Sequence, residues 1–257
     1  MKVTVLGCGA SAGVPLIGCE CGVCVSDNPK NTRTRVSILV EQGDTTILMD
    51  TSPDLRQQAL ANGFKKVDAV VYTHAHADHC HGIDDIRSLN YHLGAPIPAY
   101  GDEPTMARLQ SSFDYVFRDP IPDYGWFRPC MIANIIEPNK AFTIGDITLM
   151  PFLQNHGHVH SLGFRIGDFV YSTDVKEFLQ ESEQYLQNID TWLLDCLTDE
   201  RPMPTHADLP LSLKWIEQYK PKRGVLTHLS HSLDYDKLNT ETPANVEAAY
   251  DGMVLKF

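Results

Sequence analysis

The chain has 257 residues, of which 43% are hydrophobic, so it is long enough to bury a large core. Lysine and arginine total 21 against 33 aspartate and glutamate residues, which gives a formal net charge of −12 with histidine neutral. Extended nucleic-acid binding is not expected of such an acidic chain, because it needs many basic contacts to phosphates. The sequence has no apolar run of about 18 residues, so no membrane contact is expected.

The cysteine content indicates a reducing setting. Seven cysteines form an odd set, and three of them are crowded together as Cys19, Cys21 and Cys24. Such spacing is typical of metal binding rather than of a disulfide framework. The N-terminal run is broken too early, at Gly7, to be a signal peptide, so a cytoplasmic location is expected. The scattered cysteines are interpreted as small buried hydrophobic residues: Cys8, Cys80, Cys130 and Cys196.

Apolar runs bounded by turn-forming residues predict a strand-rich chain. The expected strands are residues 3–6, 36–41, 45–49, 68–72, 96–100, 141–144, 147–152, 162–166, 169–172, 191–196, 223–227 and 252–257. Short turns that contain glycine predict three hairpins among them, within residues 36–49, 141–152 and 162–172. The expected helices are residues 53–61, 79–93, 103–115, 176–187 and 207–219.

Two segments are expected to be irregular. Residues 116–140 mix prolines, aromatic residues and arginines, which indicates a loop over a pocket or at a subunit contact, or a packed surface excursion. Residues 154–160 are predicted to be a histidine-rich loop. No repeat or linker interrupts the chain, so residues 1–257 are expected to form a single domain. Hairpins and helices in two similar halves predict an α+β fold with two sheets face to face and helices outside.

One short stretch concentrates metal-type ligands. Residues 73–79 contain His74, His76, Asp78 and His79, directly after a predicted strand and before a predicted helix. Imidazoles with a carboxylate suit divalent metals such as zinc, manganese or iron. The alternative, a solvated polar loop, is disfavoured by the density of the cluster.

Polar residues also follow other predicted strands, which predicts their convergence at one edge of the sheets. These residues are Asp50, His156, Asp174 and His228. His158 or His160 is the alternative to His156. Asp174 has a second interpretation as the cap of the helix expected near Lys176. His81 and His92 are interpreted as surface residues or as supports of the ligands.

The His-x-His-x-Asp-His motif, followed by a later histidine, an aspartate after a strand and a last histidine, resembles the metallo-β-lactamase superfamily. The resemblance implies an αββα sandwich that binds two divalent metals, zinc or manganese. It implies one metal on His74, His76 and His156, a second on Asp78, His79 and His228, and Asp174 as the bridge. It also implies that Asp50 supports the histidine loop through a hydrogen bond.

The cysteine cluster extends this resemblance. Three thiolates need a fourth ligand to close a tetrahedral structural zinc site. The Cys-x-Cys-x-x-Cys pattern is similar to that of the cyclic-phosphate phosphodiesterases of the carbon–phosphorus lyase pathway, which implies His231 as the fourth ligand. The alternative is three reduced core cysteines. The same resemblance implies a homodimer, and it implies that His206 assists the leaving group, whereas helix capping by Thr205 beside an incidental histidine is the alternative.

The expected function is a metal-dependent phosphodiesterase that acts on a small phosphodiester, cyclic ones included. Asp78 and His206 are the residues expected to take part in catalysis, Asp78 within the metal pair and His206 as the general acid. The alternatives are a pyrroloquinoline-quinone-biosynthesis relative, a tRNA 3′-end nuclease and a non-catalytic metal-binding protein. A β-lactamase is disfavoured because its second metal usually has a different ligand set.

Overall fold

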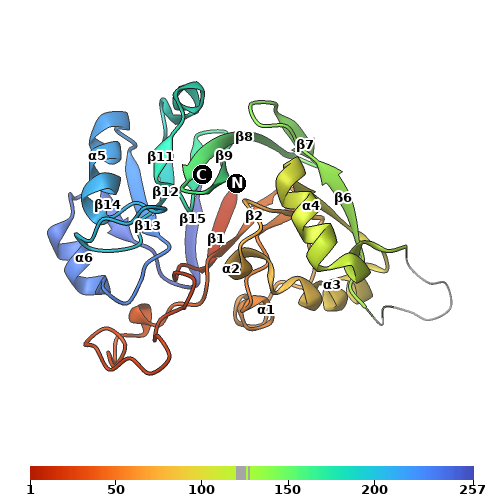
Figure 1. The fold of residues 1–257 in the computed structure, drawn as a ribbon, viewed down its shortest axis with the longest axis horizontal. Helices are drawn as coiled ribbons and strands as arrows, with labels where there is room; N and C mark the ends of the chain where they lie inside the picture. Colours follow the sequence, from red (N-terminus) through yellow and green to blue (C-terminus); the bar gives the residue numbers. More distant parts are fainter. Residues whose placement is uncertain (120–125, 127) are drawn as a thin grey trace.

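The computed structural model describes residues 1–119, 126 and 128–257. Two sheets pack face to face in the middle of the molecule, and helices cover the outer face of each sheet (Figure 1). The predicted αββα sandwich is therefore confirmed. The assignment of the whole chain to one domain stays a prediction.

The first sheet has the strand order β15-β1-β2-β3-β4-β5-β6. Its strands are β1 (Lys2–Gly7), β2 (Ser37–Gln42), β3 (Thr45–Met49), β4 (Ala69–Val71), β5 (Ile97–Gly101), β6 (Met131–Ile135) and β15 (Met253–Lys256). Strands β3 to β6 run parallel. The loops that follow β3 and β4 therefore leave the sheet at the same edge.

The second sheet has the order β11-β8-β9-β10-β12-β13-β14, and β7 pairs with β8. Its strands are β7 (Phe142–Ile144), β8 (Ile147–His156), β9 (Val159–Ile166), β10 (Phe169–Ser172), β11 (Glu177–Phe178), β12 (Thr191–Asp195), β13 (Arg223–Thr227) and β14 (Val246–Ala248). Strands β10, β12, β13 and β14 are parallel. Their carboxyl ends also share one edge, which brings the loops after β10 and β13 together.

The alternation of side chains along each strand separates the core into layers. Ile38 on β2 faces the second sheet, whereas its neighbour Leu39 faces the helices outside. On the other sheet, Leu193 faces inward and Leu194 packs beneath the outer helices. All four side chains are buried, and burial of each such aliphatic side chain stabilises the fold by roughly 1.5–3 kcal/mol.

The helices cover the two outer faces (Figure 1). On the first sheet lie α1 (Leu55–Asn62), α2 (Ala77–Cys80), α3 (Ile86–Leu93) and α4 (Glu103–Ser112), and on the second lie α5 (Leu209–Tyr219) and α6 (Tyr235–Glu241). Short 3-10 turns occur at η1 (Pro29–Asn31), η2 (Ile83–Asp85), η3 (Asp114–Phe117) and η4 (Gln180–Leu186). None of the helices in the described part of the chain is long and apolar enough to cross a membrane.

The helix predicted over residues 79–93 is interrupted. It is divided into α2, η2 and α3, and the break falls at Gly82, whose amide donates to the Thr51 carbonyl at 2.9 Å. A Cβ atom at Gly82 would lie 1.9 Å from the Ser52 carbonyl oxygen, so only glycine fits this approach. The contact between this bend and the loop after β3 fixes the orientation of α2, which carries Asp78 and His79.

The helix predicted over residues 176–187 is only partly present, as the 3-10 helix η4 (Gln180–Leu186), and no α-helix forms there. Glu177 and Phe178 form β11, which pairs with the end of β8, and η4 follows. Phe178 packs edge-on to Trp215, with ring centroids 4.6 Å apart, so tertiary packing overrides the local helical pattern. Because no helix begins near Lys176, the interpretation of Asp174 as a helix cap is wrong.

Other boundaries differ from the predictions. The segment 154–160 is not a loop, because β8 and β9 extend through it as one long hairpin. Within 116–140, expected to be irregular, Met131–Ile135 forms β6 beside β5. The predicted loop residues 120–125 and 127 lie outside the described residues. Helix α6 and strand β14 were not predicted at all.

Residues 8–36 extend below the second sheet (Figure 1). They contact the loop after β13, where the amide of Leu229 donates to the Cys8 carbonyl and the Leu229 carbonyl accepts from Ala10. Arg33 is 1% exposed, and its guanidinium donates to the carbonyls of Ser230 and Leu233. These contacts hold the segment that directly follows His228.

Candidate metal centre

The predicted ligands meet at the shared edge of the two sheets, where the backbone is strained. Asp50, Asp174 and His228 each follow a strand and have positive φ angles of 64°, 52° and 58°. Residues other than glycine rarely adopt this conformation, and such strain is concentrated at functional sites. The turns aim the three side chains back over the ends of the strands.

One group of donor atoms combines three histidines and an aspartate: His74, His76, His156 and Asp174. His74 Nε2 lies 2.9 Å from His76 Nδ1, and His156 Nε2 lies 3.1 Å from the same nitrogen. Asp174 Oδ2 is 3.6 Å from the Nε2 atoms of both His74 and His156. His76 is exposed and the other three are buried, so one side of this group is open.

The second group shares Asp174 and adds Asp78, His79 and His228. His79 Nε2 is 3.2 Å from Asp174 Oδ1 and 3.6 Å from Asp78 Oδ2. His228 Nε2 is 3.6 Å from Asp174 Oδ1 and 3.5 Å from Asp78 Oδ2. The two oxygens of the Asp174 carboxylate therefore face different groups, which is the arrangement of a bridging ligand.

The donor set fits two metal ions. Ligand atoms bound about 2.1 Å from a tetrahedral metal lie about 3.4 Å apart, close to the separations found here. The Nε2 atom of His79 is buried without a hydrogen-bond partner among the described residues. Convergence of lone pairs from several imidazoles and carboxylates is unfavourable unless a cation lies between them.

In three of the ligand candidates, a hydrogen bond holds the ring nitrogen that points away from the donor group. This hydrogen bond sets the tautomer of the imidazole. His156 Nδ1 is 2.7 Å from the Thr205 carbonyl oxygen, so it donates and leaves the Nε2 lone pair free. His79 Nδ1 is 2.7 Å from Asp50 Oδ2, and His74 Nδ1 is 3.0 Å from the Thr73 hydroxyl. Such partners orient metal-binding histidines and keep their free nitrogen available.

Burial also favours ligation by the three histidines of the first group. Burial lowers the pKa of His74, His76 and His156, which keeps these imidazoles neutral. Burial alone would raise the pKa of Asp174, but the imidazoles around it, His228 foremost, hold that pKa well below its usual range. Neutral imidazoles and an ionised carboxylate are the forms that bind metals.

The alternative histidines lie elsewhere. His158 and His160 are exposed on the hairpin beyond His156 and do not belong to either donor group. His81 packs its ring against Phe113, and His92 is exposed at the end of α3. The geometry thus supports His156 over both neighbours, although its role as a ligand stays a prediction.

The cysteine cluster is also assembled. The sulfurs of Cys19, Cys21 and Cys24 lie within 4.8 Å of one another. Cys21 Sγ is 3.6 Å from the backbone carbonyl oxygen of His231, but the His231 ring does not belong to this group within the described part of the chain. The structure therefore brings the predicted fourth ligand beside the cluster without placing its ring nitrogen at bonding distance.

His206 lies beside the second group. Its ring stacks on that of His228 with centroids 4.7 Å apart, and its Nε2 is 3.9 Å from Asp174 Oδ2. Burial lowers the pKa of His206, but the carboxylates of Asp195 and Asp174 outweigh this effect and raise the pKa to about 9. The alternative of a cap by Thr205 is wrong, because Asp208 caps α5 by accepting from the Leu211 amide at 3.0 Å.

Sequence analysis missed Asp195. This residue ends β12, is fully buried, and lies 3.0 Å from His206 Nδ1. Its signal was present, because it follows the apolar run Trp192-Leu193-Leu194 and so repeats the pattern of a polar residue at a strand exit.

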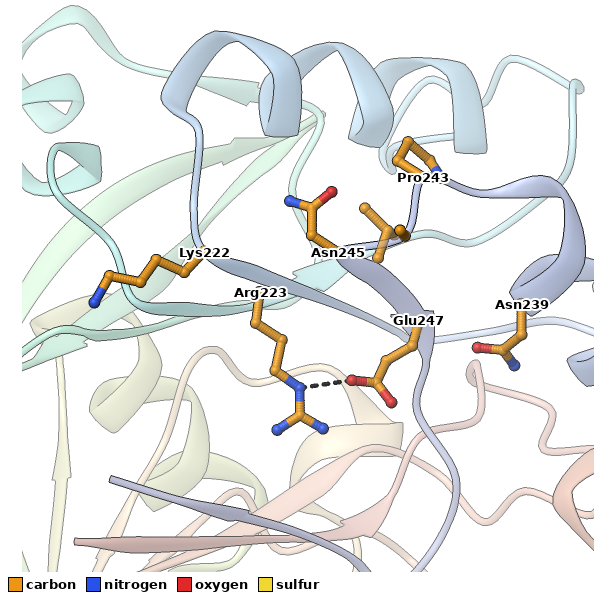
Figure 2. Close-up of a pocket in the computed structure, with 8 residues that line it drawn as sticks. Lys222, Arg223, Asn239, Pro243, Asn245 and Glu247 are labelled. Atoms are coloured by element: carbon orange, nitrogen blue, oxygen red, sulfur yellow. Dashed lines mark hydrogen bonds and ion pairs between the residues drawn. The ribbon is translucent and has the colours of Figure 1, made fainter.

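A surface pocket of about 530 Å³ lies at the opposite end of β13 from His228 (Figure 2). Its charged residues are paired: Arg223 Nε lies 2.6 Å from Glu247, and Lys222 Nζ lies 2.7 Å from Asp190 outside the pocket. Because it lies at the other end of β13 and none of its lining residues belongs to a donor group, the pocket takes no part in the metal centre.

Comparison with known proteins gives the same picture. Residues 45–229 match the family described as the beta-lactamase superfamily domain. The chain is 33% identical over 256 residues to an octanoyltransferase of Porphyromonas gingivalis, covering 98% of this chain but 51% of that protein, so it spans about half the relative's length. A crystal structure of a diphosphatase from the PhnP family superimposes with a TM-score of 0.91 at 37% identity, covering 100% of this chain and 97% of that one.

A zinc-bound PqqB from Methylobacterium extorquens shares the fold, with a TM-score of 0.81, 20% identity and complete coverage of both chains. Fold and donor groups together define a metal-binding αββα protein of a generally hydrolytic class. The chain belongs to the metallo-β-lactamase superfamily and is PhnP-like within it.

Proposed function

We propose that the protein is a metal-dependent phosphodiesterase that hydrolyses a small phosphodiester. The observation that carries the proposal is the Asp174 carboxylate, which directs one oxygen at each of two donor groups. His74, His76 and His156 would hold one metal, and Asp78, His79 and His228 would hold the other. When bound, two divalent metals supply Lewis-acid activation of the phosphoryl group and of water.

The remaining chemistry belongs to the side chains around the pair. Hydrolysis of a phosphodiester requires a proton for the departing oxygen. His206 Nδ1 contacts Asp195 at 3.0 Å, which leaves its Nε2 directed toward Asp174 and the donor groups. His206 is therefore proposed as the general acid. The exposed side of His76 is the proposed entry for substrate.

Hydrolysis of bis(p-nitrophenyl) phosphate with zinc, manganese or nickel tests the proposal. The apoprotein loaded with each metal is expected to release nitrophenolate, and the His156→Ala variant is expected to lose at least about 100-fold in kcat/KM because one metal is lost. Exposed His158 offers a matched control, and His158→Ala is expected to retain wild-type turnover. No turnover with any of the metals would refute the proposal.

Other substrates and other functions predict different results in the same assay. The PhnP-family neighbour is called a diphosphatase, so a dinucleoside diphosphate belongs in the panel beside 2′,3′-cyclic nucleotides. The pyrroloquinoline-quinone-biosynthesis alternative predicts no turnover of small diesters, whereas a tRNA 3′-end nuclease predicts cleavage of precursor tRNA in strong preference to small diesters. A non-catalytic protein predicts metal uptake without turnover of any ester. The complete donor groups favour the small-diester enzyme.

The Porphyromonas relative is named an octanoyltransferase, which makes acyl transfer an alternative activity to test. That name applies to a protein of which this chain spans about half. The donor set assembled here suits hydrolysis rather than acyl transfer, so transfer of the octanoyl group from an octanoyl thioester to an acceptor amine, with release of the thiol, is expected to be negligible beside diester hydrolysis.

Three further expectations belong to the proposal. Cys19, Cys21 and Cys24 would hold a structural zinc completed by His231 after a change in its side-chain position. The cysteines of the structure are free thiols, which supports a reducing cytoplasmic location. A homodimer is proposed from the family resemblance, and sedimentation velocity tests it.

A further inference from the structure

We infer that Asp195 is a positioning residue that orients two imidazoles of the site at once, the proposed ligand His228 and the proposed acid His206. The inference rests on the proposed metal centre and adds a residue outside its ligand set. Asp195 is fully buried at the end of β12. Each of its carboxylate oxygens faces a different histidine.

The first oxygen, Oδ2, is fixed by three donors. It accepts from the Val175 amide at 3.0 Å, from the Ala207 amide at 3.3 Å and from His206 Nδ1 at 3.0 Å. Val175 directly follows the proposed bridge Asp174. The two backbone donors prevent the carboxylate from rotating, so the position of the other oxygen is determined.

That other oxygen, Oδ1, is 3.6 Å from His228 Nδ1. Both atoms are buried, and neither has a hydrogen-bond partner among the residues that the structure describes. Leaving a buried carboxylate oxygen and a ring nitrogen unpaired is unfavourable, and each can satisfy the other. Closing the gap to the usual length of about 2.9 Å needs a movement of well under 1 Å.

The pair of Asp50 and His79 shows the same relationship already closed, at 2.7 Å. Both histidines of the group that contains Asp78 therefore have a carboxylate behind Nδ1. An imidazole that donates Nδ1–H to a carboxylate keeps its Nε2 lone pair and becomes a stronger ligand. Asp195 thus holds His228 in the tautomer that binds metal.

A metal held by Asp195, His206 and His228 themselves is the rival explanation, because their donor atoms lie within 4.8 Å of one another. The rings of His206 and His228 are nearly parallel, with an interplanar angle of 11°. Lone pairs in stacked rings lie in parallel planes and do not point at a common centre. The contact between Asp195 and His206 at 3.0 Å is a hydrogen bond in its own right.

The Asp195→Asn variant separates the contact of residue 195 with His228 from its contact with His206. The asparagine oxygen is expected to stay on the amides of Val175 and Ala207, because its NH₂ group cannot accept from them. That NH₂ group then donates to His228 Nδ1 and forces the proton onto Nε2, the nitrogen needed for ligation. Metal affinity at the site of Asp78, His79 and His228 is expected to fall 10–100-fold, while His206 keeps its partner.

Cobalt titration of the apoprotein, read by absorption and calorimetry, measures this affinity without any substrate. The proton position on His228 is read by long-range ¹H–¹⁵N NMR of the zinc-loaded protein. His206→Gln is expected to keep wild-type metal affinity while losing activity on alkyl diesters far more than on nitrophenyl diesters. The matched control, Asp102→Asn, changes a buried carboxylate that caps α4, where asparagine caps equally well, and is expected to change neither readout.

The inference would be overturned if Asp195→Asn bound both metals within twofold of wild-type affinity and its His228 were still protonated at Nδ1. If that variant does not fold, the wild type decides, because an Nε2–H tautomer of His228 overturns the inference equally. A wild type that takes up no metal at this site instead refutes the metal centre itself, so the two failures are distinguishable.

Discussion

Asp50 Oδ2 lies 2.7 Å from His79 Nδ1, and both residues are completely buried. The same carboxylate accepts from the amide and the hydroxyl of Thr73, each at 2.8 Å. The Thr73 hydroxyl in turn lies 3.0 Å from His74 Nδ1. One aspartate at the end of β3 therefore fixes both ends of the loop that carries the four ligand candidates between residues 74 and 79.

This relationship predicts the effect of Asp50→Asn. Asparagine tolerates the positive φ of 64° at this position, so the backbone is not strained by the change. Its amide oxygen is expected to accept from the Thr73 amide, which directs NH₂ at His79 Nδ1 and removes the Nε2 lone pair from the site. Metal affinity is expected to fall about 10–100-fold. Calorimetric titration measures it, and wild-type affinity in this variant would contradict the prediction.

The two donor groups are expected to differ in affinity. The group with His228 contributes Asp78 in addition to the shared Asp174, whereas the group with His156 contributes only histidines beside that bridge. Carboxylate oxygens favour a hard cation such as Mn²⁺ more strongly than imidazoles do. Manganese is therefore expected to fill the His228 group first.

Titration of manganese into apoprotein, followed by electron paramagnetic resonance, distinguishes the groups. His156→Ala is expected to retain the first manganese equivalent and His228→Ala to lose it. The reverse result would assign the tighter site to the three histidines.

The convergence of the ligand candidates was predictable from the sequence. Asp174 and His228 follow short apolar runs, and runs of this kind form strands whose polar exits share an edge when the strands are parallel. The close spacing of the four ligand candidates within residues 74–79 was visible in the sequence without the structure.

Other features depended on contacts between distant residues. Gly82 ends α2 because of the Ser52 carbonyl, thirty positions earlier, and no local pattern reports that contact. Phe178 leaves the expected helix because β8 offers an open edge and Trp215 offers a packing surface. The place of Asp195 at a strand exit was visible in the sequence, but its role was not, because its partners His206 and His228 reach it only through the fold.

Cys21→Ser is expected to lower the metal content by one ion per chain while leaving the two active-site ions in place. The midpoint of thermal unfolding is expected to fall by about 4–8 °C, the shift that a loss of about 2 kcal/mol causes in a chain of this size. Cys130→Ser is the matched control, since Cys130 is buried beside Arg118 and distant in sequence from the cluster. Elemental analysis with calorimetry checks both, and unchanged zinc in Cys21→Ser would exclude the cluster as a metal site.

Gly82→Ala tests how the bend in front of α3 supports the site. The added Cβ would lie 1.9 Å from the Ser52 carbonyl oxygen, and backbone has to move to relieve the overlap. The same turn carries a hydrogen bond from the Thr51 amide to the His79 carbonyl at 2.8 Å, so the movement reaches a proposed ligand. The free energy of unfolding is expected to fall by about 2 kcal/mol or more, together with a loss of metal affinity.

Gly22→Ala is the control for this change, because a Cβ atom there meets no described atom within 4 Å and its expected effect is within about 0.5 kcal/mol. Urea unfolding of both apoproteins separates packing from metal binding, since no metal contributes to stability in either. If the two apoproteins unfold at the same urea concentration, the close approach of Gly82 to Ser52 does not constrain the fold. If only Gly82→Ala is destabilised, the close approach of Gly82 to the Ser52 carbonyl is needed to hold α2 in its orientation.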